Sequence, residues 1–186
     1  QWEDFKQHNA IRILDRYRHR LPSFNDDIQG TAGVVTAGIQ VAVKALGEPL
    51  SAQRFVFLGS GAAGIGIARL IRWAMVEEGG LKDGERPPVA MLDSNGLVFE
   101  GRDPLDKDKE EFMLTTEDMG RYGFEPGTRY DLETVIRHVE PTVLIGTSGT
   151  PGAFTEGAIR EMGAHAARPI VFPLSNPTSK TEAQPS

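Results

Sequence analysis

The sequence lacks cysteine, a long apolar run and an excess of basic residues. Without cysteine, disulfides, thiolate metal ligands and cysteine nucleophiles are excluded, and a reducing, cytoplasmic location is expected. No apolar stretch approaches the roughly 18 residues needed to cross a bilayer, and no signal-peptide pattern opens the chain. Lys plus Arg number 20 against 26 Asp plus Glu, giving a formal net charge of −6. Because such a surface repels anions, we expect no nucleic-acid or membrane partner.

What the sequence does contain is a composition typical of a folded domain. Its 186 residues are 39% hydrophobic and 25% charged, enough apolar side chain to bury a core. The chain opens on Gln1 and runs directly into a helical pattern, and it closes on a polar tail, Thr181–Ser186. We expect an interior piece of a longer protein.

Short apolar runs alternate with helical patterns over most of the chain. We expect strands at 54–58, 89–92, 142–145 and 170–174, with helices at 65–78, 132–139 and 155–166. Two further helices, 4–20 and 28–46, precede them, the second ended by Gly47. Glycines at 30, 33 and 38 would let another backbone approach this second helix closely. The pattern predicts an α/β fold, a doubly wound parallel Rossmann-type sheet with helices on both faces. Residues 1–47 would form a helical segment and residues 48–186 the dinucleotide-binding domain.

A glycine-rich loop follows the first expected strand and opens a helix. It matches G-x-G-x-x-G and consists of Gly59, Ser60, Gly61, Ala62, Ala63 and Gly64. In this context one glycine makes the turn, the next admits a pyrophosphate and the third packs helix on strand. The loop therefore predicts dinucleotide binding, and a turn used only for packing is the alternative.

Polar residues follow the other expected strands. Asp93 ends the second strand and could accept hydrogen bonds from an adenosine ribose, although it lies 29 residues after Gly64 rather than about 20. A strand-end turn residue is the alternative for Asp93. Thr147–Thr150 and Ser175–Pro177 follow the third and fourth strands, where the loops of an open sheet face ligands. Asn176 could bond a carboxylate or carboxamide, and an Asn-Pro turn without function fits equally well.

Two acidic pairs, Glu3-Asp4 and Asp26-Asp27, flank the first helix. Carboxylates from adjacent segments could hold Mg²⁺ or Mn²⁺, which prefer oxygen ligands. The pairs read equally well as helix-terminal acidic residues and caps. The four histidines show no metal-ligand spacing, and no G-x-S-x-G elbow is present.

Taken in order, these segments resemble malic enzymes, the divalent-metal-dependent oxidative decarboxylases of malate. The resemblance spans essentially the whole chain. It rests on Trp2–Phe5, Phe24-Asn25-Asp26-Asp27-Ile28-Gln29-Gly30-Thr31-Ala32, the glycine loop, Leu92–Leu97, Ala153-Phe154-Thr155 and Leu174–Thr178.

The resemblance assigns roles to the acidic pairs and to the loops. Glu3, Asp4 and Asp27 match the Mn²⁺ or Mg²⁺ ligands, and Asp26 matches a residue that interacts with a catalytic lysine. Asn176 matches a residue near substrate and nicotinamide, while the glycine loop, Asp93 and Ser94 match the cofactor site. The implied reaction oxidises malate to bound oxaloacetate, reduces NAD(P)⁺ and releases CO₂ to give pyruvate, in an enzyme that is a homo-oligomer, a dimer or a tetramer.

The resemblance also shows what does not match. The family's tyrosine acid, lysine base and substrate-binding arginine would lie upstream of Gln1, and an asparagine-rich segment downstream of Asn176. No lysine or tyrosine of this sequence stands in the matching context. We therefore expect the isolated chain to be inactive.

The cofactor stays open between NAD and NADP. Asp93 favours NAD⁺ because a carboxylate repels a 2′-phosphate. Lys107 or Lys109 could compensate for that repulsion, which would allow NADP⁺. Two other functions remain open: a cofactor domain of the amino-acid dehydrogenase type and a non-catalytic NAD(P)-binding module.

Overall fold

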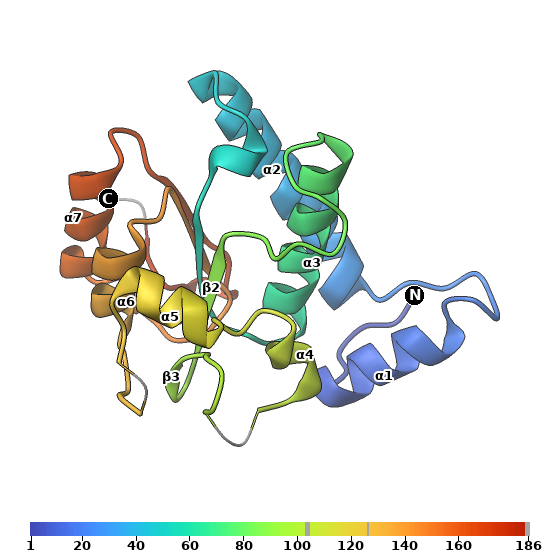
Figure 1. The fold of residues 1–186 in the computed structure, drawn as a ribbon. Coiled ribbons are helices and arrows are strands. Elements are labelled where there is room, and N and C mark those ends of the chain that lie inside the picture. The colour runs from blue at the N-terminus through green and yellow to red at the C-terminus, as the bar shows by residue number, and fades with distance from the viewer. Residues whose placement is uncertain (103–104, 126, 185–186) are drawn as a thin grey trace. The chain divides into compact units, whose positions relative to one another are not determined.

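The computed structural model describes residues 1–102, 105–125 and 127–184. Contacts divide the chain into two compact units. The first consists of Gln1–Ala52 with Gly61–Pro87, and the second of Gln53–Ser60 with Pro88–Ser186. Figure 1 colours the chain from its N-terminus to its C-terminus. The predicted domain boundary after residue 47 stays a prediction.

The second unit contains a five-stranded sheet ordered β3-β2-β1-β4-β5. Its strands are β1 (Phe55–Leu58), β2 (Val89–Asp93), β3 (Gly96–Leu97), β4 (Val143–Gly146) and β5 (Ile170–Pro173). The pairs β1–β2, β1–β4 and β4–β5 are parallel, as predicted, because each strand is a short apolar run buried in the sheet. Only β2–β3 is antiparallel. The α/β, Rossmann-type fold class is thereby confirmed.

The helices of this unit are α4 (Lys107–Glu110), α5 (Thr116–Tyr122), α6 (Leu132–Val139), α7 (Glu156–His165) and the 3₁₀ turn η3 (Thr178–Lys180). Side-chain caps mark where three of them, α5, α6 and α7, begin. The side chain of Asp131 accepts the Thr134 N–H at 2.9 Å, and that of Thr155 accepts the Ala158 N–H at 3.1 Å. These caps start α6 and α7 at the predicted positions.

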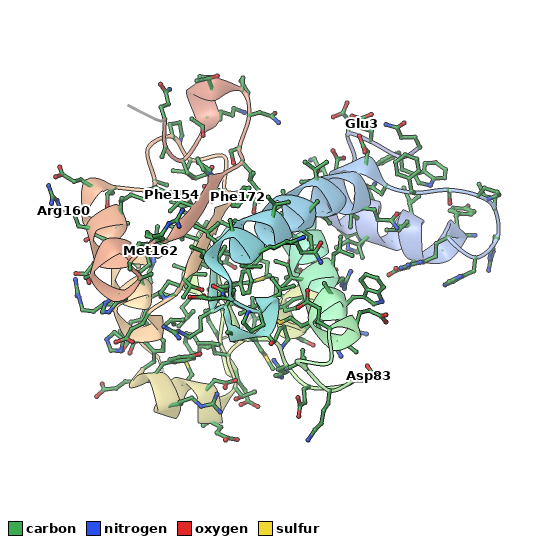
Figure 2. All side chains as sticks on the ribbon, turned by 90° about the horizontal axis from the view of Figure 1, so that it is seen from above. Glu3, Asp83, Phe154, Arg160, Met162 and Phe172 are labelled. Carbon is green, nitrogen blue, oxygen red and sulfur yellow. The ribbon has the colours of Figure 1, made fainter. Side chains whose placement is uncertain are left out.

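The core of the second unit lies between its sheet and helices α6 and α7. It includes Val56 and Leu144 from the strands, Ile136 from α6 and Met162 from α7. Figure 2 labels Phe154 and Met162, which are buried here, and Arg160, which projects outward from α7.

The first unit is helical. It contains α1 (Gln7–Tyr17), the π turn η1 (Asp26–Gly30), α2 (Thr31–Leu46), the 3₁₀ turn η2 (Leu50–Ala52) and α3 (Ala62–Glu77). Helix α2 ends at Gly47, whose φ of +74° is the left-handed conformation that glycine adopts most readily. At Gly66 of α3, a Cβ would lie 2.5 Å from the Ile28 carbonyl oxygen, so this glycine lets α3 approach η1.

Several features of the fold were not predicted. The expected helix 28–46 begins with the π turn η1, and the two-residue strand β3 is too short to show a pattern. The predicted approach of another backbone does not occur at Gly30, where a Cβ would meet the Asp26 side chain, or at Gly33, where it would meet nothing within 4 Å; it occurs at Gly66. In the described part of the chain, no helix combines the length and apolar character that a membrane crossing requires.

Candidate functional site

The glycine loop begins where the strand order of the sheet reverses. Strand β1 lies between β2 and β4, which follow it in the chain on opposite sides. In open parallel sheets, ligands bind beyond the carboxyl ends of the strands at this reversal. The Gly59 N–H donates to the Leu92 carbonyl at 2.8 Å, and the Thr147 N–H donates to the Leu58 carbonyl at 2.8 Å. The three strand ends are thus tied together where the loop starts.

Gly59 is required at this place for two reasons. Its φ of +117° disfavours any side chain, and a Cβ would lie 2.6 Å from the Thr147 backbone. The Thr147 hydroxyl donates to the Gly59 carbonyl at 3.1 Å, which completes the contact. The tight turn expected of the first motif glycine is therefore present.

The rest of the loop leads into α3. Ser60 is buried in the second unit, and Gly61, the first motif residue of the first unit, is the N-cap residue of α3. No side chain caps this end, and the first backbone bond of the helix joins the Ile65 N–H to the Gly61 carbonyl at 3.0 Å. The amides of Ala62, Ala63 and Gly64 precede that bond, at the positive end of a 16-residue helix. Such amides suit an anionic group.

Asp93 ends β2, as predicted, and its carboxylate is surrounded by donors. Oδ1 accepts from the Asn95 N–H at 2.8 Å and from Arg102 Nη1 at 3.0 Å. Oδ2 accepts from Arg102 Nη2 at 2.6 Å and from Lys109 Nζ at 2.8 Å. Burial raises the pKa of Asp93, but these donors outweigh it and lower the pKa to about 2. A carboxylate offers about four acceptor positions, so all of those of Asp93 are in use.

Of the two lysines considered as compensating cations, the structure brings Lys109 to Asp93, whereas Lys107 is exposed. Sequence reasoning missed Arg102, nine residues after Asp93 and separated from it by the β2–β3 turn. Arg102 also lines a cavity of about 360 Å³ in the second unit, together with Asn95, Phe99, Gly101, Gly127, Thr128 and Arg129. Arg129 donates to the carbonyl of Ser94 at 3.0 Å, which places Ser94 in the turn beside this cavity.

The loops after β4 and β5 meet in the second unit. The Gly149 N–H donates to the Ser175 hydroxyl at 2.8 Å, and Asn176 follows on the surface. Beneath both loops lies the carboxylate of Glu182, which sequence reasoning placed in a polar tail. Its partners lie 7 and 34 residues away in the chain, so the local pattern carries no signal for it.

The two acidic segments lie side by side in the first unit. Trp2 and Asn25 form an isolated parallel bridge. The Trp2 N–H donates to the Phe24 carbonyl, and the Asp26 N–H donates to the Trp2 carbonyl, each at 2.9 Å. The Asp4 N–H donates to Asp27 Oδ2 at 3.0 Å. The structure therefore brings the predicted ligand segments together.

The carboxylates of these two segments do not form a metal centre in this arrangement. Gln1 Nε2 donates to Glu3 at 3.2 Å and to Asp26 at 3.4 Å, and one Asp27 oxygen is taken by the Asp4 backbone. Across residues 1–102, 105–125 and 127–184, no three His, Asp or Glu side chains are placed to hold one ion. As they lie here, Glu3, Asp4 and Asp27 do not fit a bound divalent cation.

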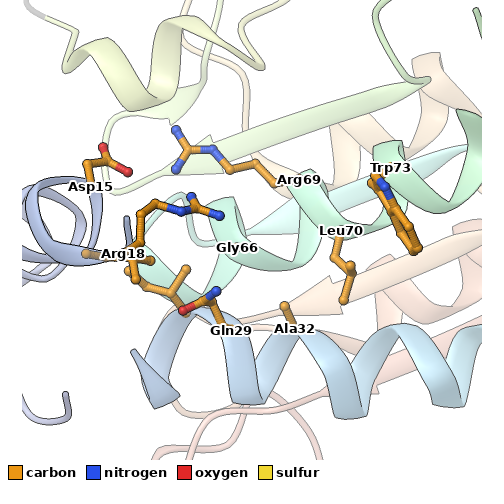
Figure 3. A pocket seen from close by; sticks show the side chains of 10 residues that line it. Asp15, Arg18, Gln29, Ala32, Gly66, Arg69, Leu70 and Trp73 are labelled. Atoms are coloured by element: carbon orange, nitrogen blue, oxygen red, sulfur yellow. The ribbon is translucent and has the colours of Figure 1, made fainter. Parts of the chain in front are cut away.

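A second cavity of about 360 Å³ lies within the first unit (Figure 3). Figure 3 shows Arg18 of the α1 end and Arg69 of α3 extending into it from opposite walls, with Asp15 nearby. Ile28 and Ala32 supply apolar lining. None of the predicted site residues lines this cavity.

The strand reversal in the sheet and the obligatory Gly59 at the carboxyl end of β1 are the features of a Rossmann-type dinucleotide-binding domain. The sequence model of the family described as "Malic enzyme, NAD binding domain" matches residues 28–186. The chain belongs to the malic enzyme family. This decides against the amino-acid dehydrogenase alternative.

Relatives and solved structures agree with that assignment. The chain is 47% identical over all 186 residues to the NAD-dependent malic enzymes of Vibrio campbellii and Vibrio parahaemolyticus, and it spans 33% of each. The malic enzyme of Entamoeba histolytica superimposes with a TM-score of 0.70 and 28% identity, over 96% of this chain and 34% of that one. The NAD-dependent malic enzyme of Thermotoga maritima gives 0.72 and 27%, over 96% and 42%. The chain thus spans about a third of its curated relatives.

Proposed function

We propose that the chain is the NAD-binding portion of a malic enzyme that converts malate to pyruvate and CO₂ while reducing NAD(P)⁺. The observation that carries the proposal is the glycine loop at the strand reversal of a chain from this family. When bound, the dinucleotide would supply the hydride acceptor. The chain's own residues bind and orient it.

The proposed cofactor contacts run across the carboxyl ends of the strands. The amides that follow Gly61 would bind the pyrophosphate, since Gly59 and Gly61 carry no side chain to block it. The adenosine would lie toward Asp93 and Ser94, and the nicotinamide toward the loops after β4 and β5. Asn176 is proposed to contact the carboxamide or the substrate.

NAD⁺ is the proposed cofactor, and the names of the relatives support it. NADP⁺ is a second candidate because Arg102 and Lys109 place two cations around the single charge of Asp93. A 2′-phosphate beside this cluster would meet a net positive charge. Which dinucleotide binds more tightly depends on whether Arg102 and Lys109 stay bonded to Asp93 or turn toward a 2′-phosphate.

The metal is proposed on the family resemblance, with support from the adjacency of the two acidic segments. Glu3, Asp4 and Asp27 would have to turn toward a common point to bind Mn²⁺ or Mg²⁺. Asp26 is proposed as a partner of a catalytic lysine outside this chain.

Turnover is not expected of the isolated chain. The proposed acid and base belong to segments that this sequence does not match, so proton transfer would lack positioned groups. Homo-oligomerisation and a cytoplasmic location stay part of the proposal. A non-catalytic NAD(P)-binding module is the remaining alternative, and malate oxidation by a protein that contains this chain would exclude it.

Calorimetric titration tests the proposal directly. NAD⁺ and NADP⁺ are titrated into the chain, each with and without Mn²⁺, and saturable binding of one dinucleotide is expected. Gly59→Val, which would meet the Thr147 backbone, should abolish binding, and Gly84→Val, whose Cβ meets nothing within 4 Å, serves as a control for altering a positive-φ glycine. A folded wild-type chain that binds neither dinucleotide would contradict the proposal.

The metal is tested separately by Mn²⁺ titration in the absence of nucleotide. Glu3→Gln with Asp27→Asn should abolish Mn²⁺ binding, whereas Glu77→Gln with Glu78→Gln, at the far end of α3, should not. Equal Mn²⁺ affinity in both double variants would remove Glu3 and Asp27 from the proposal.

A further inference from the structure

Glu182 is the only acidic or basic residue in the described part of the chain that is fully buried, with 0% of its surface exposed. Four donors from two serines surround its carboxylate. Oε1 accepts from the Ser148 N–H at 2.7 Å, the Ser148 hydroxyl at 2.9 Å and the Ser175 hydroxyl at 2.6 Å. Oε2 accepts from the Ser175 N–H at 3.2 Å. A buried charge persists only when it is bonded in this way.

The two serines belong to different loops of the second unit. Ser148 follows β4, and Ser175 follows β5 and directly precedes Asn176. Each serine hydroxyl also accepts a hydrogen bond from the loop backbone. The Ser148 hydroxyl accepts the Thr150 N–H at 3.1 Å, and the Ser175 hydroxyl accepts the Gly149 N–H at 2.8 Å. One carboxylate therefore fixes the spacing of both loops.

The chain holds Glu182 in place from its own backbone. The Phe154 N–H donates to the Glu182 carbonyl at 3.0 Å, and the Gly152 N–H donates to the Thr181 carbonyl at 3.1 Å. Space for the carboxylate comes from Gly146, where a Cβ would lie 2.6 Å from Glu182 Cδ. Gly146 is the last residue of β4, so the strand end itself is shaped to receive this side chain.

The hydrogen bonds also favour the ionised carboxylate. Burial raises the pKa of Glu182, but the bonds from Ser175 and Ser148 outweigh burial and hold the pKa below its ordinary value. All four donors point at the two oxygens, so the geometry matches an acceptor without a proton.

We propose that Glu182 is a positioning residue, whose buried carboxylate fixes the loops after β4 and β5 so that they form the nicotinamide end of the dinucleotide site. This rests on the proposed function. Because a dinucleotide crosses the sheet at the strand reversal, AMP would occupy the Asp93 side and would not reach these loops. Loss of Glu182 should therefore weaken binding of NAD⁺ and leave AMP binding unchanged.

The test compares NAD⁺ and AMP affinities of the wild-type chain and Glu182→Gln. The amide keeps the shape but replaces one acceptor with a donor, so NAD⁺ affinity should fall about tenfold or more. Ser175→Ala, a milder change, should lower NAD⁺ affinity less, and Glu156→Gln, exposed on α7, should have no effect. Equal losses for NAD⁺ and AMP, or no loss of either by a folded variant, would overturn the proposal.

Amide hydrogen exchange separates this proposal from the proposed function. In the wild-type chain the Ser148 and Ser175 amides should be protected, and in Glu182→Gln both should exchange faster while the strand amide of Ile145 stays protected. If the wild-type chain binds no nucleotide, the proposed function fails, and this exchange pattern still decides whether Glu182 fixes the loops. Unchanged protection of both serine amides in Glu182→Gln would contradict the proposed role of Glu182.

Discussion

Arg102 forms a two-point ion pair with Asp93, with Nη2 at 2.6 Å from Oδ2 and Nη1 at 3.0 Å from Oδ1. Nη1 also donates to the carbonyls of Gly96 at 3.0 Å and Leu97 at 2.9 Å. The guanidinium thereby joins the end of β2 to β3. Both side chains are mostly buried, so solvent screens the pair only weakly.

Arg102→Lys should destabilise the second unit although it keeps the charge. A lysine ammonium cannot reproduce the two parallel bonds or reach both carbonyls, so the loss should be about 1–3 kcal/mol. Urea denaturation followed by circular dichroism measures it. Arg160→Lys, whose ion pair with Glu156 is exposed, should change stability by less than about 0.5 kcal/mol. Equal losses of stability in the two variants would show that the two-point ion pair of Arg102 stabilises the unit no more than an exposed ion pair does.

Stability should fall in acid as Asp93 takes up a proton. Its pKa is lowered from 3.8 to about 2, so the stabilisation is complete above about pH 4 and is lost as the pH falls toward 2. A shift of this size corresponds to about 2 kcal/mol. Urea midpoints measured from pH 6 to pH 2 should fall less steeply in Asp93→Asn than in the wild-type chain. Parallel curves would contradict the lowered pKa.

Lys109→Gln should change the choice between the two cofactors. Removing this cation leaves the charge of Asp93 balanced by Arg102 alone, so any affinity for NADP⁺ should fall about tenfold while NAD⁺ affinity changes little. Calorimetry with both dinucleotides measures the ratio. Lys107→Gln, at an exposed position two residues earlier, is the matched control. An unchanged ratio in Lys109→Gln would exclude Lys109 from 2′-phosphate recognition.

Two glycines of the first unit should respond in opposite ways to alanine. Gly66→Ala would press a Cβ against the Ile28 backbone and should cost about 2 kcal/mol or more. Gly33→Ala meets open space on an exposed helix face and should stabilise α2 by about 0.5–1 kcal/mol. Urea denaturation followed by tryptophan fluorescence reports on this unit, because Trp2 and Trp73 both lie in it. A stabilising Gly66→Ala would refute the close approach of α3 and η1.

Thr155→Ala should shorten the start of α7. The substitution removes the cap on the Ala158 N–H and the bond from the Thr155 hydroxyl to Glu133, at a cost of about 1 kcal/mol. Thr155→Ser keeps the hydroxyl and should recover most of the loss. Urea denaturation of the three chains is the measurement, and an alanine variant as stable as the serine one would show that the cap is dispensable.

The sequence alone determined the local structure and the family. Apolar runs predicted the four parallel strands, and Gly47 and Asp131 predicted helix ends because their signals act within a few residues. The resemblance to malic enzymes followed from residues in linear order. The proposed metal ligands and catalytic residues are still predictions.

Only the tertiary structure showed which distant side chains share a site. Glu182 is 34 residues from Ser148, and Arg102 reaches Asp93 only because the β2–β3 turn folds back. Such pairs depend on strand order and on which loops meet beyond the sheet, and composition and periodicity do not encode these. The sequence likewise did not predict the role of Gly66, because that role depends on the Ile28 backbone lying against it.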